Sequence, residues 1–270
     1  MKITFLGGGN MANALIGGML KQGFGSSDIT VIEPGSEARS KLSTTYAVAC
    51  LEAAEQLVTA GDLLVLAVKP QQMKEAVVPL IGKLGDAVVV SIAAGLDLET
   101  LARFLGGHRK IVRCMPNTPA LIGAGITGLC PLPEVSKEEC TAADRVLRAV
   151  GNTVWIADEG KMDGVTAISG SGPAYVFLFI EALQQAAADL GFTPEQGRQL
   201  AIETVQGAAD LAAQSSEPAS VLRERVTSKG GTTAAALQTM AEKGVKEGIV
   251  AGVMAAEARG RELGKLLGAA

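Results

Sequence analysis

Cysteine is scarce in this chain of 270 residues, and its few copies lie far apart. They are Cys50, Cys114, Cys130 and Cys140. None has the paired spacing of a metal site, so we expect no bound metal ion. Isolated thiols of this kind are typical of reduced, cytoplasmic proteins.

An excess of positive charge is also missing. The chain has 24 Lys and Arg against 28 Asp and Glu, a formal net charge of −4 at pH 7. Proteins that bind nucleic acid carry a basic footprint, so we expect no nucleic-acid partner.

Long uninterrupted hydrophobic runs are lacking as well. Met1 leads directly into the first predicted strand, which leaves no room for a signal peptide. The longest apolar stretch of the second half is interrupted by Glu181 and Gln184, so we expect no membrane-spanning helix and no membrane partner. These features predict a cytoplasmic location.

Strong general bases are rare where a substrate would bind. His108, the single histidine, lies in a Gly-rich loop and is expected at the surface, and no lysine occurs from Met162 to Ser228. Dehydrogenation of an alcohol usually needs histidine or lysine as a base. A C=N bond is less demanding, because its nitrogen can arrive protonated and a hydroxyl group can orient it. The scarcity of bases therefore fits reduction of a C=N bond better than dehydrogenation of an alcohol.

A glycine-rich motif stands near the start of the chain. Gly7-Gly8-Gly9-Asn10-Met11-Ala12 follows the apolar run Ile3–Leu6 and precedes an amphipathic stretch. In a dinucleotide fingerprint, Gly7 permits the tight turn, Gly9 lets the backbone approach a pyrophosphate, and Ala12 allows close packing of the helix. The helix start offers unpaired N–H groups to the phosphates. The alternative is a glycine turn before a core helix.

Strand and helix signals alternate through about residue 157. Apolar β-type runs are Ile3–Leu6, Ile29–Ile32, Leu63–Val68, Ala87–Ile92 and Ile111–Met115, with helical segments near 10–22, 36–44, 51–59, 71–83 and 97–105. This order predicts a parallel sheet covered on both faces. Ile126–Cys130 and Thr153–Ile156 indicate additional edge strands around a helix over 137–150.

Helical periodicity takes over after Gly164. Helices are predicted from Pro173 to about Leu190, from Pro194 with Thr193 and Gln196 forming a capping box, and near 218–227, 232–243 and 246–267. The predicted fold class is α/β, with a Rossmann-like parallel-sheet domain over 1–160 and an all-helical domain over 161–270.

Three predicted strands end in segments that suit a nicotinamide cofactor. They are Ala67-Val68-Lys69-Pro70, Ile92-Ala93-Ala94-Gly95 and Met115-Pro116-Asn117-Thr118-Pro119. Ligands of a doubly wound sheet bind beyond the carboxyl ends of its strands. Each segment alone is equally typical of a turn, and the set favours a cofactor site.

Two further glycine loops open helices in the second half. Ser169–Pro173 and Thr227–Thr233 both carry successive glycines, which leave backbone N–H groups pointing outward as a nest for a small anion. A carboxylate substrate would suit the second loop, with a threonine hydroxyl to spare. The alternative is an ordinary turn between helices.

Taken together, these segments resemble pyrroline-5-carboxylate reductase, the last enzyme of proline biosynthesis. The matching segments are Phe5–Ala12, Ala67–Pro70, Ser91–Gly95, Arg113–Pro119, Ser169–Tyr175 and Ser228–Thr233, in order over nearly the whole chain. The first is shared with many reductases. The Pro-Asn-Thr-Pro segment and the Gly-Gly-Thr-Thr helix start are far more specific.

The resemblance implies that NAD(P)H delivers a hydride to 1-pyrroline-5-carboxylate and gives L-proline. It implies substrate binding by Ser228, Gly230, Gly231, Thr232 and Thr233, with Thr233 as the catalytic residue whose hydroxyl reaches the ring nitrogen. The helical half would form a homodimer or higher homo-oligomer with a shared active site. Lys229 stands where many members carry proline, which should alter loop stiffness more than chemistry.

The cofactor is expected to be NADPH, with NADH as the alternative. The residues expected to bind it are Leu6, Gly7, Gly9, Asn10, Met11, Ala12, Ser36, Arg39, Ala67, Val68, Lys69, Pro70, Ala93, Ala94, Gly95, Pro116 and Asn117. Glu33 ends the second strand, where an acidic residue normally holds the ribose 2′-hydroxyl of NAD. Ser36 and Arg39 follow at once and could cradle a 2′-phosphate, and similar reductases mostly favour NADPH.

Two other functions are open to a chain of this kind. A β-hydroxyacid dehydrogenase also joins a Rossmann domain to helices, but its motif would require lysine at the position of Val176. A nucleotide-sensing module that binds a partner is the non-enzymatic alternative. Turnover of NAD(P)H with an imino acid would distinguish the enzyme from the sensor.

Overall fold

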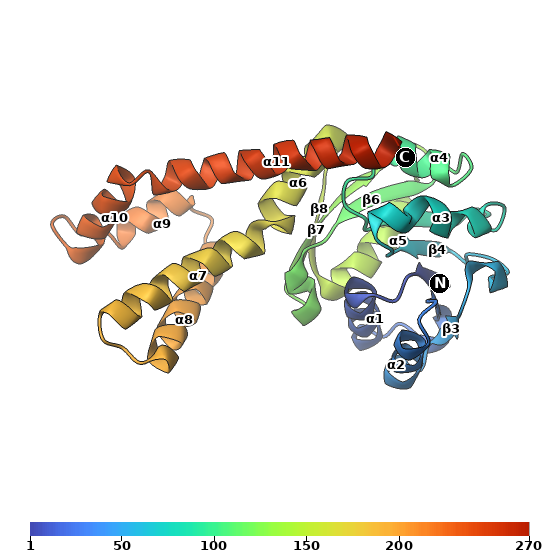
Figure 1. Ribbon diagram of the computed structural model, residues 1–270, viewed down its shortest axis with the longest axis horizontal. Helices are drawn as coiled ribbons and strands as arrows, with labels where there is room; N and C mark the ends of the chain where they lie inside the picture. The colour runs from blue at the N-terminus through green and yellow to red at the C-terminus, as the bar shows by residue number, and fades with distance from the viewer. Residues whose placement is uncertain (270) are drawn as a thin grey trace. The chain divides into compact units, whose positions relative to one another are not determined.

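The structure, a computed structural model, describes residues 1–269, and they form two compact units (Figure 1). The sheet unit comprises Met1–Ser171 together with the residues from Ala256 onward, and the helical unit comprises Gly172–Ala255.

The sheet unit is built on eight strands. They are β1 (Ile3–Leu6), β2 (Ile29–Ile32), β3 (Ala49–Leu51), β4 (Leu63–Leu66), β5 (Val88–Ser91), β6 (Ile111–Met115), β7 (Gly125–Pro131) and β8 (Gly151–Trp155). Their order is β3-β2-β1-β4-β5-β6-β7-β8, and β7 runs antiparallel to β6 while the other neighbours are parallel. The predicted fold class is confirmed. The order reverses between β1 and β4, where such folds bind ligands.

Helices cover both faces of the sheet. One face carries α3 (Met73–Val77) and α4 (Leu98–Phe104), and the other carries α1 (Asn10–Lys21), α2 (Ser36–Tyr46) and α5 (Lys137–Leu147).

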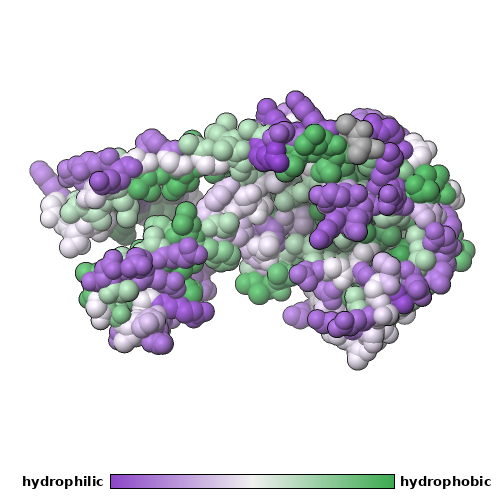
Figure 2. Space-filling model, in the orientation of Figure 1, coloured by the Kyte–Doolittle hydropathy of each residue, from purple (hydrophilic) through white to green (hydrophobic). Residues whose placement is uncertain are grey.

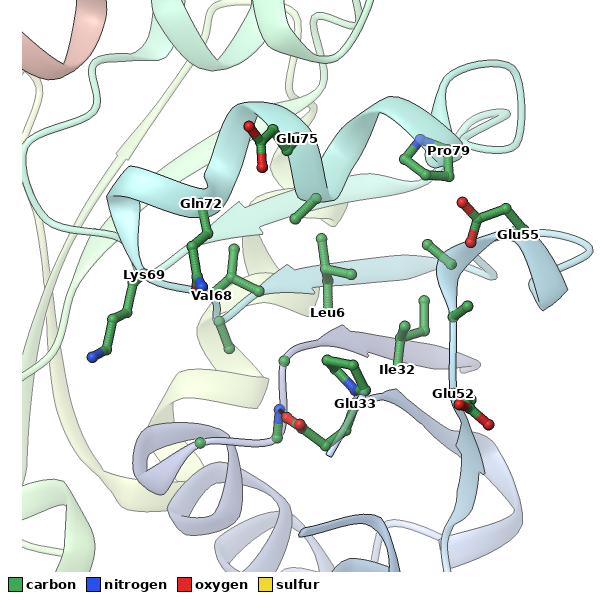
Figure 3. A pocket seen from close by; sticks show the side chains of 18 residues that line it. Leu6, Ile32, Glu33, Glu52, Glu55, Val68, Lys69, Gln72, Glu75 and Pro79 are labelled. Carbon is green, nitrogen blue, oxygen red and sulfur yellow. Dashed lines mark hydrogen bonds between the residues drawn. The ribbon is translucent and has the colours of Figure 1, made fainter. Parts of the chain in front are cut away.

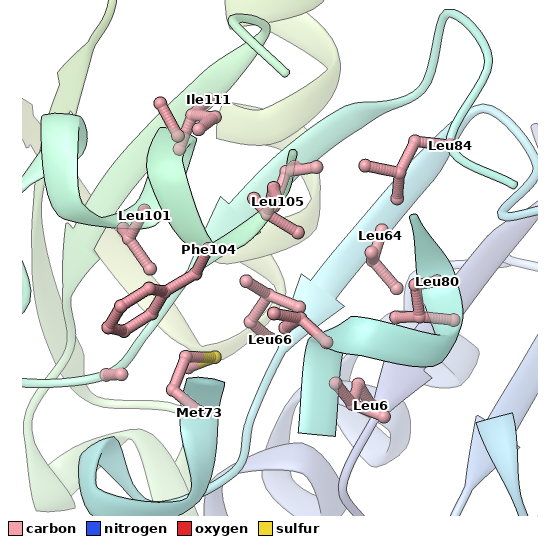
Figure 4. Close-up of a cluster of buried hydrophobic side chains, with 14 of the residues drawn as sticks. Leu6, Leu64, Leu66, Met73, Leu80, Leu84, Leu101, Phe104, Leu105 and Ile111 are labelled. Atoms are coloured by element: carbon pink, nitrogen blue, oxygen red, sulfur yellow. The ribbon is translucent and has the colours of Figure 1, made fainter. Parts of the chain in front are cut away.

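Strand β4 shows why the sheet needs both layers. Leu64 and Leu66 are fully buried on the face that carries α3 and α4, in the same hydrophobic cluster as Met73 and Phe104 (Figure 4). Leu63, which points the other way, is fully buried against the opposite helices. Successive residues of a strand face opposite sides, so a central strand must be apolar throughout.

The predicted helix over 51–59 is wrong. Ala49–Leu51 forms the edge strand β3, with Cys50 opposite Val31 of β2, and only one short 3-10 turn follows at Ala54–Gln56. Three residues are too few to show a strand pattern. Pairing with β2 therefore overrides the local helical preference.

The predicted helix over 71–83 is broken into three pieces. A 3-10 turn at Pro70–Gln72 leads into α3, and a second one at Val78–Leu80 follows it. Pro79 has no N–H group to donate to a carbonyl one turn earlier, which ends the α-helical hydrogen bonding.

The helical unit contains the helices predicted for it. They are α7 (Gly172–Asp189), α8 (Pro194–Gln214), α9 (Ala219–Arg225), α10 (Thr232–Glu242) and the first part of α11 (Val245–Ala269). The predicted capping box at α8 is confirmed. Thr193 Oγ1 accepts from the Gln196 N–H at 3.3 Å, and the Gln196 side chain accepts from the Thr193 N–H at 3.0 Å.

The last part of α11 belongs to the sheet unit. Leu267 packs against the sheet core, and Arg103 donates to the carbonyl oxygen of Gly268 at 2.6 Å. The compact units therefore do not divide at residue 160. Whether residues 1–160 and 161–270 fold as separate domains is a different question, and that division stays a prediction.

The helix α7 continues an earlier helical run without a break. The short α6 (Met162–Val165) passes through a π-helical turn at Thr166–Gly170 into α7. Within the described chain, Glu159–Asp189 is the one helical stretch long and apolar enough to cross a membrane, so the interruptions at Glu181 and Gln184 do not by themselves exclude a membrane span. A single such helix is weak evidence, because helices of soluble proteins pass the same test.

Candidate active site

A cavity of about 670 Å³ opens beyond the carboxyl ends of β1, β2 and β4 (Figure 3). Six of the residues predicted to bind the cofactor line it. They are Leu6, Gly7, Gly9, Ala67, Val68 and Lys69. The cavity lies where the strand order reverses, which is the position expected for a dinucleotide.

The two fingerprint glycines have different physical tasks. Gly7 has φ +99°, and a Cβ there would lie 2.8 Å from the carbonyl oxygen of Ala67. A side chain at Gly7 would therefore collide with the loop after β4. Gly9 has open space within 4 Å of its Cβ position among the described atoms, so a phosphate can approach its backbone closely.

The start of α1 has the features of an anion-binding site. Gly9 is its N-cap, no described side chain caps it, and its first turn holds no acidic residue. The loop is fixed by Asn13, whose Nδ2 donates to the carbonyl oxygens of Gly8 at 2.7 Å and Gly9 at 3.0 Å. The N–H groups of Asn10, Met11 and Ala12 are thus left for a ligand. This geometry fits the pyrophosphate of a dinucleotide.

Glu33 points into the glycine loop. Its carboxylate accepts from the N–H of Gly8 at 2.9 Å and from the N–H of Gly35 at 2.8 Å, and the residue lines the cavity. The predicted cofactor residues Ser36 and Arg39 lie on α2, outside the set that lines the cavity.

A second cavity, of about 250 Å³, holds another part of the predicted cofactor set. Pro70, Ala94 and Gly95 line it, together with residues of α11. Gly95 has φ +80°, and a Cβ there would lie 3.2 Å from Leu267 Cδ1. Ala93 is buried beneath this loop. Nine of the seventeen predicted cofactor residues thus line one of these two cavities of the sheet unit.

The end of β6 is tied into the protein. Asn117 Nδ2 donates to the carbonyl oxygen of Ser169 at 3.2 Å, and its Oδ1 accepts from the N–H of Ile126 at 3.0 Å. Both ends of this buried amide are satisfied internally, and Pro116 beside it is buried too. In this structure the Asn117 side chain fixes the π-helical turn to the sheet, and its role toward a cofactor stays a prediction.

Several lining residues were not predicted. They are Gly8, Ile32, Pro34, Glu52, Ala53, Ala54, Glu55, Gln72, Glu75, Ala76 and Pro79. Glu52 follows β3 directly, so recognising that strand would have placed its carboxyl end at this edge of the sheet. The short sequence Ala-Cys-Leu gave no such signal.

The predicted substrate residues share one turn of the helical unit. Gly230 has φ +73°, and the N–H of Gly231 donates to the carbonyl oxygen of Ser228 at 3.0 Å. Gly231 is the N-cap of α10, and within residues 1–269 no side chain caps this helix. Thr232 and Thr233 form its first turn, so their N–H groups and hydroxyls are available to an anionic ligand.

The thiols of the chain are not arranged for chemistry. All four cysteines are free in the described structure, and burial raises the pKa of each thiol above its ordinary value. They are therefore neutral at pH 7 and poor nucleophiles. In the part of the chain that the structure describes, no cluster of three His, Cys, Asp or Glu side chains could hold a metal ion.

Comparison with known families matches both halves of the chain. Residues 159–263 match the family described as pyrroline-5-carboxylate reductase dimerisation, and residues 2–95 match the family described as NADP oxidoreductase coenzyme F420-dependent. A pyrroline-5-carboxylate reductase of Pseudomonas aeruginosa is 41% identical over 270 residues, which cover 99% of this chain and 98% of that protein.

Solved structures agree with the sequence relatives. A pyrroline-5-carboxylate reductase from Coxiella burnetii superposes with a TM-score of 0.92 at 37% identity, covering 97% of this chain and 98% of that one. The Plasmodium falciparum pyrroline carboxylate reductase with NADP bound superposes with a TM-score of 0.87 at 29% identity, covering 98% of both chains.

Proposed function

The chain belongs to the pyrroline-5-carboxylate reductase family, and from this we infer its reaction. It is an oxidoreductase that reduces 1-pyrroline-5-carboxylate to L-proline with NAD(P)H, the last step of proline biosynthesis. The observation that carries this function is identity of 41% with a curated reductase over 99% of the chain.

The sheet unit would hold the cofactor. NAD(P)H, when bound, supplies the hydride for the imine carbon. The exposed backbone at Gly9 and the uncapped start of α1 would bind the pyrophosphate. Leu6 and Val68 line the same cavity and would offer apolar surface to the bound nucleotide.

The turn Ser228–Thr233 would hold the substrate. Its tight geometry and the uncapped start of α10 support binding of the substrate carboxylate by backbone N–H groups and by the hydroxyls of Ser228 and Thr232. The hydroxyl of Thr233 would hydrogen-bond the ring nitrogen and fix the orientation of the imine carbon. A hydroxyl is sufficient here, because the imine nitrogen can arrive already protonated. Hydride addition to the carbon then gives the amine directly, and no general acid has to supply a proton.

Purified protein is expected to oxidise NAD(P)H when 1-pyrroline-5-carboxylate is added, and to show little activity with simple 2-keto acids. The loss of nicotinamide absorbance measures both reactions under the same conditions. Faster turnover of 2-keto acids than of the imine would contradict the proposed function.

The helical unit is proposed to form a homodimer or a higher homo-oligomer. Phe177 and Leu178 of α7 are 60% and 66% exposed, and hydrophobic residues reach the surface along these helices (Figure 2). Residues 159–263 match a family described as dimerisation. A partner subunit would cover this apolar surface, so the apolar Glu159–Asp189 helix needs no membrane around it. The proposed substrate is a small molecule, and the proposed reaction involves no nucleic acid. The free cysteines support a cytoplasmic location.

Light scattering at micromolar concentration, without detergent, is expected to give at least twice the chain mass of 27.6 kDa. Burial of the exposed α7 side chains against a second copy provides the stabilisation. A monomer in detergent-free buffer, or a protein recovered only with membranes, would contradict this assembly.

A further inference from the structure

The cofactor cavity is acidic near the end of β2, where the adenosine ribose of a dinucleotide would lie. We infer that Glu33 discriminates against a 2′-phosphate, so that this chain uses NADH in preference to NADPH. The inference rests on the proposed function and concerns only which form of the cofactor is bound. It runs against the preference for NADPH that the family resemblance implies, and three features of the cavity support it.

The first feature is that the backbone donors are already occupied. Successive N–H groups at the end of β2 and in the glycine loop could bind a phosphate. Here the N–H groups of Gly8 and Gly35 both donate to the carboxylate of Glu33, at 2.9 and 2.8 Å. Glu33 thus places an internal anion on the donors that a 2′-phosphate would need.

The second feature is that the nearest cation is engaged. Arg39 Nη1 donates to the carbonyl oxygens of Glu33 at 2.9 Å and Pro34 at 2.6 Å. Its Nη2 lies 3.3 Å from a carboxylate oxygen of Glu52. The guanidinium is therefore directed at the backbone and at Glu52, and its charge is already balanced by a carboxylate.

The third feature is the charge of the remaining lining. Glu52, Glu55 and Glu75 line the cavity besides Glu33, and Lys69 is the only basic residue among its described lining residues. Figure 3 shows Lys69 at the opposite end from Glu55, with its side chain extending away from the cavity. A phosphate with a charge of about −1.5 to −2 would be repelled here. A ribose hydroxyl can instead donate to the spare acceptor capacity of Glu33.

The test is the binding of NAD⁺ and NADP⁺ to the wild-type protein, measured separately by isothermal titration calorimetry. We expect NAD⁺ to bind about ten-fold more tightly than NADP⁺, the ratio that corresponds to one repulsive, partly solvated charge pair. Tighter binding of NADP⁺ would overturn the inference and leave the reductase function standing. If neither dinucleotide binds, the proposed function fails together with the inference.

Two variants separate Glu33 from the overall charge. Glu33→Ser removes the carboxylate and frees the N–H groups of Gly8 and Gly35, so the preference for NAD⁺ should fall about five-fold or more through tighter binding of NADP⁺. Glu138→Gln, on the exposed first turn of α5, changes the net charge equally and should leave the ratio unchanged. An unchanged ratio in Glu33→Ser, or an equal change in both variants, would overturn the assignment to Glu33.

The wild-type ratio decides the inference even if Glu33→Ser does not fold. Circular dichroism checks the fold of the variant before titration. Glu33→Gln provides a further variant, since it keeps the length of the side chain and one acceptor oxygen while removing the charge. It should shift the ratio in the same direction as Glu33→Ser, and a shift in the opposite direction would contradict a role for charge.

Discussion

Thr233→Val is expected to lower kcat/KM roughly ten- to a hundred-fold, which corresponds to about 1–3 kcal/mol of lost transition-state stabilisation. The substitution keeps the shape of the side chain and removes its hydroxyl. The structure favours a role toward the ligand over a role in the helix, because α10 has Gly231 as its N-cap and no described side chain caps it. Steady-state kinetics with 1-pyrroline-5-carboxylate and the melting temperature are measured on the same protein.

Thr239→Val is the matched control for this experiment. Thr239 lies on the same helix, and its hydroxyl donates to the carbonyl oxygen of Ala235 at 3.1 Å. Its replacement changes one exposed hydrogen bond within the helix, so kcat/KM should stay near the wild-type value. If Thr233→Val is destabilised and retains near wild-type kcat/KM, Thr233 has a structural role only.

Arg113→Met is expected to lower the free energy of unfolding by about 3 kcal/mol, the lower end of the range for breaking a buried ion pair. Arg113 on β6 is 7% exposed, and its guanidinium lies 3.0 Å from Glu159 Oε1 and 3.1 Å from Asp163 Oδ1. Methionine fills the space but leaves both carboxylates without their cation. Because their side chains are 28% and 21% exposed, water offsets part of the loss.

Arg109→Met is the control for the ion-pair cluster. Arg109 also faces two carboxylates, Glu99 at 2.8 Å and Glu134 at 2.9 Å, but all three side chains are substantially exposed. Exposed pairs are screened by water, so this variant should be much less destabilised than Arg113→Met. Urea denaturation at one fixed protein concentration compares them, because an oligomer gains stability with concentration. Equal losses would show that burial of Arg113 has no special effect.

Much of the sheet unit could be predicted from residues alone. Runs such as Leu63–Leu66 are apolar on both faces of a strand, and a central parallel strand covered by two helix layers requires that pattern. The fingerprint could also be predicted, because Gly7 and Gly9 meet backbone constraints that the structure shows directly.

The rest depended on contacts that local sequence does not contain. β3 forms because β2 offers an unpaired edge. The three residues Ala49–Leu51 are too short to show a strand pattern that would predict this pairing. The position of Glu33 could be predicted, but the direction of its carboxylate could not, because it is fixed by the N–H groups of Gly8 and Gly35. The amide of Asn117 is likewise fixed by residues far along the chain.

The return of α11 to the sheet unit has a consequence for synthesis on the ribosome. Residues up to Ser171 emerge first, but the unit they form also includes the residues from Ala256 onward. Domains generally fold as units in the order of their synthesis. Here the sheet can form early, while the place that Leu267 fills beside its core stays empty until that residue has been synthesised. The first unit to begin folding is thus completed only after α11 has left the ribosome.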